Sequence, residues 1–421
     1  MTSPRDHLLA VYRQALLAVR GEERTRQALL EMGLTAWPAA HPLAVVAIGK
    51  AAESMMRGAL SVLGERMVAG LVITKQHDAR GEALAHDKLV VMTAGHPLPD
   101  QHSLAAGGTL LAFMDDQPPQ VQFVFLISGG ASSLVEVLPE GVSLDQLQRV
   151  NHWLLSNGWG IAAMNRVRQR LSCIKGGRLA RWLKGRKATC LLISDVPGDR
   201  PEMIGSGLLF ADGDADPHDG DAYTDLPAWI TALPPAPPAP RNGDACFDTL
   251  DAKIIACLDD ATQAAADAAK ALGYAVIRHR PMISGDTEMV GRHLAQQLCD
   301  TKPAFHIWGG ETSLCLPPQP GRGGRNQHMA LVVASALVGR SACYFLAAGT
   351  DGTDGPTQDA GALVDAQSIA RARRSGLDPA QALREADAGN FLAASGDLIR
   401  TGPTGTNVMD LMLGLKLASP S

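Results

Sequence analysis

The sequence predicts an α/β protein of two domains, the first built around a mostly parallel sheet. Short apolar or β-branched runs alternate with amphipathic stretches of helical spacing, which is the pattern of parallel strands covered by helices. The chain has 421 residues, and at about 150 residues per domain we expect two or three compact units. Its hydrophobic fraction of 46% is ordinary for a globular protein, so the chain can bury a core.

Five buried strands are predicted in the first half of the chain. Each run ends in Gly, Ser, Thr or Lys, and helical spacing generally follows it. The runs are LAVVAIG (43–49), GLVITK (70–75), KLVVMT (88–93), FVFLIS (123–128) and TCLLIS (189–194). Because ligands of such sheets gather at the carboxyl ends of the strands, the residues that follow these runs are the first candidates for a site.

A proline-rich stretch at 226–242 predicts a linker, because proline lacks the N–H donor and favours an extended path. We therefore expect one domain over 1–240 and a second, smaller α/β domain over 243–421. In the second domain a helix is predicted at 259–273, with strands at 274–279, 304–310, 343–349 and 361–365. For residues 385–421 we leave open two alternatives, which are packing within the second domain or packing back on the first domain.

Charge and cysteine usage limit the classes of partner and the cellular compartment that fit the sequence. With 38 basic and 43 acidic residues the net charge is −5, which argues against nucleic acid or anionic lipid as a partner. The seven cysteines form no C-x-x-C pair, so neither a disulfide framework nor a zinc site is indicated. No apolar run reaches the roughly 18 residues of a membrane span. We expect a cytoplasmic protein with small-molecule partners, and the sequence is compatible with a homodimer.

Two loops after predicted strands in the first half could bind anions. Lys50 follows the first strand and opens a helix, where an ammonium can meet an anionic group beside the helix amides; a solvated lysine is the alternative. Gly129 and Gly130 allow close backbone approach, and Ser132 and Ser133 add hydroxyl groups. Such a loop suits phosphate, although a simple turn explains it equally well.

Two charged candidates lie further along the first domain. The basic run at 164–180, which contains Lys175, could ring an anion or form a solvated helix face. Asp195 directly follows a buried strand, where a carboxylate is suited to Mg²⁺. Capping a helix or forming a turn is the alternative for Asp195.

Three glycine-rich segments of the second domain complete the candidates. A loop delivers Arg325 at the start of a helix, where its planar guanidinium is suited to polyphosphate; a flexible surface loop is the alternative. Asp351 lies in a turn with two other aspartates, whose like charges repel unless a cation or hydrogen-bond donors relieve them. The segment 402–407 is expected to open a helix whose amides could hold an anion, and a simple capped turn is the alternative.

Taken in order, the segments AIGKA, AGHPLPD (94–100), SGGASSL, RLSCIKGGRLA, SDVPGD, GGET, GGRNQ, GTDGTDGPT and TGPTGTN resemble the glycerate 2-kinase family over nearly the whole chain. The C-terminal region is similar to the family's MOFRL-type domain. The resemblance implies ATP- and Mg²⁺-dependent phosphorylation of D-glycerate to 2-phosphoglycerate. It also implies a Rossmann-like first domain, a smaller α/β domain and an active site in the cleft between them.

Carried over position by position, the family's functional lysine falls on Lys50 and its functional arginine on Arg325. Our hypothesis adds Asp351 as the group that orients or deprotonates the hydroxyl, with Mg²⁺ on Asp195, Asp351 or both. The residues expected to line nucleotide or substrate are Gly129, Gly130, Ser132, Ser133, Lys175, Gly310, Glu311, Gly323, Gly324, Asn326, Thr404, Gly405, Thr406 and Asn407.

Two other functions compete with a kinase. A nicotinamide-dependent hydroxypyruvate reductase needs a dinucleotide pocket, but no predicted strand is followed by G-x-G-x-x-G. A non-catalytic module that binds a small acid would leave the many charged candidates without a use. The sequence therefore favours phosphoryl transfer.

Overall fold

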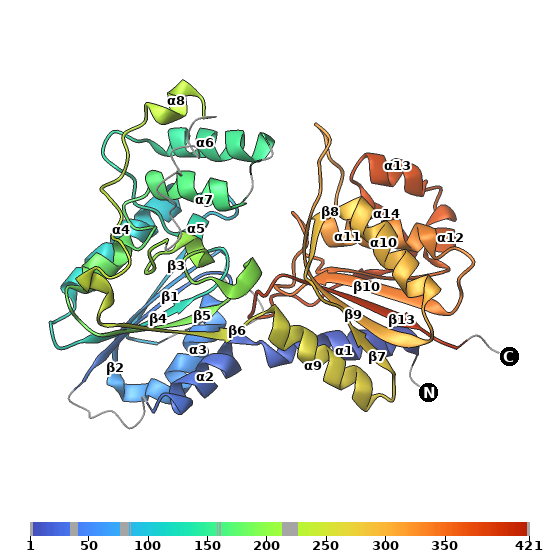
Figure 1. Ribbon diagram of the computed structural model, residues 1–421, viewed down its shortest axis with the longest axis horizontal. Coiled ribbons are helices and arrows are strands. Elements are labelled where there is room, and N and C mark those ends of the chain that lie inside the picture. The colour runs from blue at the N-terminus through green and yellow to red at the C-terminus, as the bar shows by residue number, and fades with distance from the viewer. Residues whose placement is uncertain are drawn as a thin grey trace. The chain divides into compact units, whose positions relative to one another are not determined.

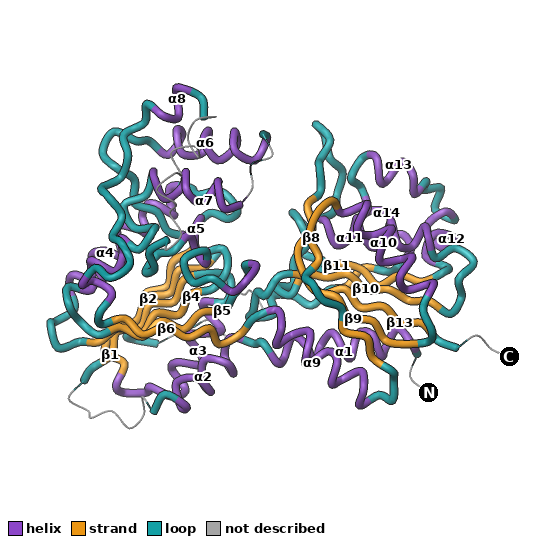
Figure 2. Tube along the Cα trace, viewed as in Figure 1, coloured by secondary structure: helices purple, strands orange, loops and turns teal. Residues whose placement is uncertain are grey.

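The computed structural model describes residues 3–33, 41–75, 84, 86–157, 159, 161–212 and 226–418. The chain divides into two compact units, which are unit 1 (Met1–Arg20 with Cys257–Ser421) and unit 2 (Gly21–Ala256). Each unit is a sheet covered by helices, which confirms the predicted α/β class (Figures 1 and 2). In the described ranges no helix is long and apolar enough to cross a membrane.

Unit 2 is built on sheet A, whose six strands are all parallel. They are β1 (Leu43–Ile48), β2 (Met67–Thr74), β3 (Leu89–Thr93), β4 (Gln122–Ile127), β5 (Ala188–Ile193) and β6 (Leu250–Ala256). The order β3-β2-β1-β4-β5-β6 is that of a doubly wound sheet, in which the order of the strands reverses between β1 and β4. All five predicted strands are present, but β3, which was expected to be buried, is an edge strand with no buried residue. The sequence patterns miss β6 because Asp251 and Lys253 interrupt it at the sheet edge.

Helices cover both faces of sheet A. α2 (Gly21–Glu31) and α3 (Ala52–Leu63) lie on one face, and the remaining helices lie on the other side (Figure 1). Those are α4 (Gln101–Asp116), α5 (Ala131–Leu134), α6 (Leu144–Ser156), α7 (Ile161–Arg170) and α8 (Ala228–Thr231). The larger core lies between the sheet and the α4 side, and it contains Val46, Phe123 and Leu192.

The proline-rich stretch packs inside unit 2 and does not join two domains, so the predicted linker is wrong. Leu226, Ile230 and Leu233 are buried against α6 and α7. The Arg178 Nε atom donates to the carbonyl oxygen of Pro237 at 2.6 Å. Proline removes donors but keeps its carbonyl, so this segment can be tied down by arginine side chains. The division between the units falls after β6, at Ala256 and Cys257.

Unit 1 is built on sheet B, which mixes antiparallel and parallel pairs. Its strands are β7 (Val276–Arg278), β8 (Ile283–Asp286), β9 (Ala304–Ser313), β10 (Cys343–Gly349), β11 (Gly361–Asp365), β12 (Leu398–Ile399) and β13 (Asp410–Lys416). The order is β12-β11-β10-β13-β9-β7, with β8 also on β9. Neighbours from β12 to β9 are antiparallel, and β7 and β8 run parallel to β9.

The central strand β13 replaces the helix predicted after residues 402–407. Its residues are buried on both faces from Asp410 to Leu415. A short apolar run that is buried on both faces has no period to separate strand from helix, which is why the sequence predicts a helix here and the structure has a strand. The helix N-terminus expected to hold an anion at 402–407 therefore does not exist.

Two groups of helices cover sheet B (Figure 1). α1 (Pro4–Ala18) and α9 (Leu258–Ala271) lie on one face. The other face carries α10 (Thr287–Asp300), α11 (Arg325–Ala336), α12 (Ser368–Arg373), α13 (Pro379–Arg384) and α14 (Ala388–Ser395). Because α14, β12 and β13 complete unit 1, residues 385–418 lie in the C-terminal unit, which differs from the expected packing on the first domain.

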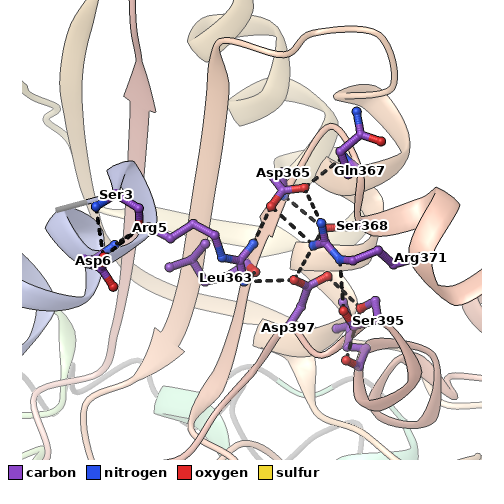
Figure 3. Close-up of polar contacts among 11 residues, drawn as sticks. Ser3, Arg5, Asp6, Leu363, Asp365, Gln367, Ser368, Arg371, Ser395 and Asp397 are labelled. Carbon is purple, nitrogen blue, oxygen red and sulfur yellow. Dashed lines mark hydrogen bonds and ion pairs between the residues drawn. The ribbon is translucent and has the colours of Figure 1, made fainter. Parts of the chain in front are cut away.

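The helix α1 is fastened to unit 1 by an ion-pair network (Figure 3). The Arg5 guanidinium lies 2.5 Å from Asp365 Oδ2 and 2.9 Å from Asp397 Oδ1. Arg371 contacts the same two carboxylates from α12. The buried side chain of Asp397 therefore joins three segments that are far apart in the sequence, and the first helix belongs to unit 1.

Candidate active site

Lys50 lies at the carboxyl end of β1, next to the point where the strand order of sheet A reverses. Its backbone N–H donates to the carbonyl of Gly129, which follows β4, at 2.9 Å. Gly49 makes this possible because its φ is +130° and a Cβ there would lie 2.5 Å from the Ser128 carbonyl oxygen. Crevices at such reversal points are the usual ligand sites of doubly wound sheets.

Lys50, His96, Gly129 and Gly130 form what we call the β1–β4 cluster. Gly130 has a φ of +84°, and a Cβ on it would lie 3.1 Å from both Lys50 Cγ and His96 Cδ2. Helix α3 starts beside this cluster, where the Ala51 N–H donates to Ser128 Oγ at 3.0 Å and the Ala52 N–H donates to the Gly49 carbonyl at 3.2 Å. The partial positive charge of a helix start attracts anions. His96 adds a polar group that the residue-by-residue sequence candidates do not include.

The two candidate serines have different roles in the loop after β4. The Ser132 hydroxyl lies 2.8 Å from the Ser206 hydroxyl, which donates to Asn165 Oδ1 at 3.1 Å. Ser206 has a φ of +59°, an uncommon conformation for a residue other than glycine. The Ser133 hydroxyl donates to the Gly130 carbonyl at 3.2 Å, so it closes the local turn. Ser206 and Asn165 are not among the site residues predicted from the sequence.

Asp195 and Lys175 differ in access. Asp195 follows β5 and is half-buried at the same carboxyl edge as Lys50. The Lys175 side chain is only 1% exposed, and its ammonium forms an ion pair with Glu136, which is equally buried. Burial lowers the pKa of Lys175, although Glu136 opposes this. Lys175 therefore holds a buried ion pair, whereas the sequence analysis expected it at an open anion site.

Unit 1 gathers charge around Arg325, which opens α11 as predicted. Arg325 Nε lies 2.6 Å from Asp410 Oδ2, and its second terminal nitrogen donates to Asp410 Oδ1 at 3.2 Å. The other terminal nitrogen lies 2.5 Å from Glu311 Oε1. Burial lowers the pKa of Arg325, but Asp410 and Glu311 outweigh it and keep the pKa above its ordinary value. Arg325, Glu311, Asp354 and Asp410 are called the Arg325 cluster below.

Asp354 occupies the start of α11. Its carboxylate accepts the backbone N–H of Asn326 at 3.0 Å and of Gln327 at 2.7 Å. Burial raises the pKa of Asp354 to about 7, against these two hydrogen bonds. Gly324 lets the carboxylate approach, because a Cβ there would lie 2.4 Å from Asp354. These two first-turn amides of α11 are thus already used, and an anion could reach them only by displacing Asp354.

Glycines beside the Arg325 cluster keep the strands close. Gly310 lies opposite Asp410 across β9 and β13, and a Cβ on it would overlap the Ile283 backbone of β8. Gly323, with a φ of +148°, passes beside the backbone N of Gly389. These two candidates therefore place Glu311 and Arg325 through the backbone.

Of the three aspartates in the run 351–359, only Asp351 is partly exposed. Its Oδ1 accepts the N–H and the hydroxyl of Thr353 at 2.9 and 3.0 Å. Asp359 is fully buried on Arg322 and Arg400, and Asp354 caps α11. Asp351 is thus the carboxylate of this run that suits a metal or a substrate hydroxyl.

The loop 402–407 packs on the Asp351 turn. The Thr404 hydroxyl donates to the Thr350 carbonyl at 2.6 Å, and a Cβ on Gly352 would lie 2.1 Å from the Gly402 carbonyl oxygen. Gly405 has a φ of +73°, which glycine adopts easily. Thr406 and Asn407 are buried. These candidates support the turn that carries Asp351.

The donor chemistry around Asp195 and Asp351 suits Mg²⁺. No group of three or more His, Cys, Asp or Glu within the described ranges is arranged for a metal ion. Mg²⁺ needs only one or two carboxylates, because water and substrate phosphates complete its shell. Asp195 and Asp351 are both partly exposed, and they belong to different units.

Comparisons with known proteins cover both units. The family model for a domain of unknown function, DUF4147, matches residues 7–224, and that of the MOFRL family matches 304–410. A D-glycerate 2-kinase of Thermotoga maritima is 35% identical, over 88% of this chain and 90% of its own. An Agrobacterium vitis relative that carries the provisional name of hydroxypyruvate reductase is 36% identical, over 87% of this chain and 97% of its own.

The fold agrees with these relatives. The crystal structure of a glycerate kinase from Thermotoga maritima superimposes with a TM-score of 0.80 at 32% identity, and it covers 98% of this chain and 99% of that one. One family model thus spans half of the chain, and the similarity to a kinase extends through both units. The chain therefore belongs to the glycerate 2-kinase family of enzymes.

Proposed function

We propose that this enzyme transfers the γ-phosphoryl group of ATP to the 2-hydroxyl of D-glycerate, giving 2-phosphoglycerate and ADP. The observation that carries the proposal is the position of Lys50, at the reversal point of sheet A and beside the start of α3. A cation near a helix N-terminus is locally unfavourable. An anionic ligand at this point would offset the positive charge of the ammonium and of the helix start together.

The residues divide the work of phosphoryl transfer. Lys50 and the Gly129–Gly130 backbone would hold anionic oxygens of substrate or nucleotide, and Arg325 would stabilise charge on the transferred group. The substrate hydroxyl attacks the γ-phosphorus, the bond to the ADP oxygen breaks, and Asp351 accepts the hydroxyl proton. Such reactions need mainly positioning and charge neutralisation, which this set of residues can supply without a covalent intermediate.

Asp195, Asp351 or both would hold Mg²⁺. When bound, the ion would neutralise charge on the nucleotide phosphates. Their partial exposure leaves room for the water and phosphate oxygens that this ion keeps in its shell. Removal of divalent ions by EDTA should abolish turnover, and Mg²⁺ should restore it.

The test is a coupled assay with D-glycerate and ATP on Lys50→Ala and Arg325→Ala. Each change should lower kcat/KM by about 100-fold or more, because charge stabilisation of this kind contributes that much to phosphoryl transfer. Near-wild-type kcat/KM in both variants would refute the proposal. Phosphorus NMR of the product would distinguish 2- from 3-phosphoglycerate, and oxidation of NADH with hydroxypyruvate in the absence of ATP would favour the reductase.

A further inference from the structure

Asp410 is the buried carboxylate that forms an ion pair with Arg325. It lies on the central strand β13 and its side chain is 2% exposed, whereas the side chain of Glu311, the other carboxylate on Arg325, is 45% exposed. Asp410 contacts two nitrogens of the guanidinium, at 2.6 and 3.2 Å. A two-point contact fixes the plane of the group, which a single exposed contact cannot do.

The backbone around Asp410 is shaped for this contact. Its cross-strand neighbours are both glycines, Gly310 on β9 and Gly349 on β10. A Cβ on Gly349 would lie 3.5 Å from Asp410 Oδ1 and 2.7 Å from the Thr353 carbonyl oxygen. The phenol of Tyr12 in α1 donates to the Gly349 carbonyl at 2.7 Å. The carboxylate therefore lies over side-chain-free positions, and the strand beneath it is held by a buried hydrogen bond.

Electrostatics requires such a partner. Arg325 is the first residue of α11, where the partial positive charge of the helix start opposes a cation. Its side chain is also two-thirds buried, so the guanidinium needs compensating charge. Asp410 supplies it on the side of Nε, and the remaining terminal nitrogen pairs with the exposed Glu311. An anionic ligand could replace Glu311 without disturbing the grip of Asp410.

We propose that Asp410 is the positioning residue that orients Arg325 toward the phosphoryl group, with Glu311 holding the ligand-facing nitrogen until substrate arrives. The inference rests on the proposed role of Arg325 and extends it to a residue that touches no substrate. Asp410 acts only through Arg325, so its effect on turnover must vanish when Arg325 is absent.

A double-mutant cycle tests this with D-glycerate and ATP. Asp410→Asn should lower kcat by about 10- to 100-fold, the effect of misplacing a catalytic group by an ångström, with a smaller change in KM for ATP. In the Arg325→Ala background the same change should lower kcat no further. Guanidinium chloride at sub-denaturing concentration should partly restore Arg325→Ala, but not Arg325→Ala with Asp410→Asn.

The matched control is Asp397→Asn. Asp397 is also a buried carboxylate that pairs with two arginines in unit 1 (Figure 3), but it lies at the edge of sheet B, beside β12, whereas β13 is a central strand. It should lower the melting temperature comparably and leave kcat unchanged. Should Asp410→Asn fail to fold, Asp410→Glu keeps the charge and displaces the carboxylate, so kcat should fall while folding is retained.

The outcomes separate the two proposals. Loss of kcat in Arg325→Ala with wild-type kcat in Asp410→Asn and Asp410→Glu would overturn the positioning role alone. An equal loss from Asp410→Asn with and without Arg325, or guanidinium rescue that is indifferent to Asp410, would also overturn it. Wild-type kcat in Arg325→Ala would refute the role of Arg325 together with this inference.

Discussion

Removal of the Lys175 ammonium should destabilise unit 2 strongly. The side chains of Lys175 and Glu136 are each 1% exposed, and they pair with each other. In Lys175→Met the Glu136 carboxylate keeps the Val137 N–H at 3.0 Å and stays buried without its paired ammonium, with the Arg168 charge still acting on it. Breaking a buried ion pair by removing one partner costs about 3–5 kcal/mol. A methionine fills most of the space, so the cost is electrostatic.

That free energy becomes a shift in melting temperature. For a unit of 150–250 residues, 1 kcal/mol corresponds to about 2–4 °C, so the transition of unit 2 should fall by ~6–20 °C. Differential scanning calorimetry would follow the two units separately. The double variant Lys175→Met with Glu136→Leu removes both charges, and it should recover most of the loss because apolar replacement of a buried pair is often neutral.

The reasoning is refuted by two results. A melting temperature of Lys175→Met within about 2 °C of the wild type would be a much smaller change than the expected fall. It would mean that the ion pair is not buried. A double variant no more stable than the single one would mean that packing, and not the lone charge, carries the effect. If instead Lys175 bound the nucleotide, Lys175→Met would raise KM for ATP at an unchanged melting temperature.

Two further predictions concern the loop after β1 and the start of α11. Gly49→Ala should lower kcat/KM at least about tenfold by displacing Lys50, because the added Cβ would meet the Ser128 backbone. The control is Gly64→Ala, whose glycine has a φ of +51° in open space, and it should leave kcat/KM unchanged. Equal losses of kcat/KM in the two variants would contradict the argument. Burial raises the pKa of Asp354 to about 7, so its contribution to stability is full below about pH 4 and is lost as the pH rises through 7. Melting curves of Asp354→Asn from pH 4 to 8 should lack that fall, and a slope equal to the wild type would exclude Asp354 as its source.

The buried parts of the fold were predictable because burial leaves a pattern in the sequence. β1, β4 and β5 are buried at nearly every position, which gives the apolar runs from which the parallel sheet was predicted. β6 lies at an edge, so its exposed Lys253 breaks the pattern. β13 has the opposite difficulty, because an apolar run buried on both faces is compatible with helix or strand. Its pairing with β9 and β10 decides the matter, and that pairing is long-range.

The candidate site was predictable only where backbone chemistry shows in the sequence. A cation directly after a glycine-rich turn indicated Lys50 and Arg325, and both lie at helix starts. Their partners are not encoded nearby. Asp410 lies 85 residues after Arg325, and its one local sign is a single charge inside the apolar run 408–415. Lys175 shows the converse, because a basic run gives no sign that one lysine turns inward to Glu136.

The helix starts beside Lys50 and Arg325 both have amides that are already bonded, and this constrains how each cation can act. α11 begins with its Asn326 and Gln327 amides on Asp354. At the start of α3 the Ala51 N–H donates to Ser128 Oγ at 3.0 Å and the Ala52 N–H donates to the Gly49 carbonyl at 3.2 Å. Under the proposed function we therefore expect Lys50 to hold phosphate oxygens and Arg325 to meet the charge that develops during transfer, both mainly through their side chains, with the orientation of Arg325 set by Asp410. Loss of Lys50 should then raise KM as well as lower kcat, whereas loss of Asp410 should act mainly on kcat.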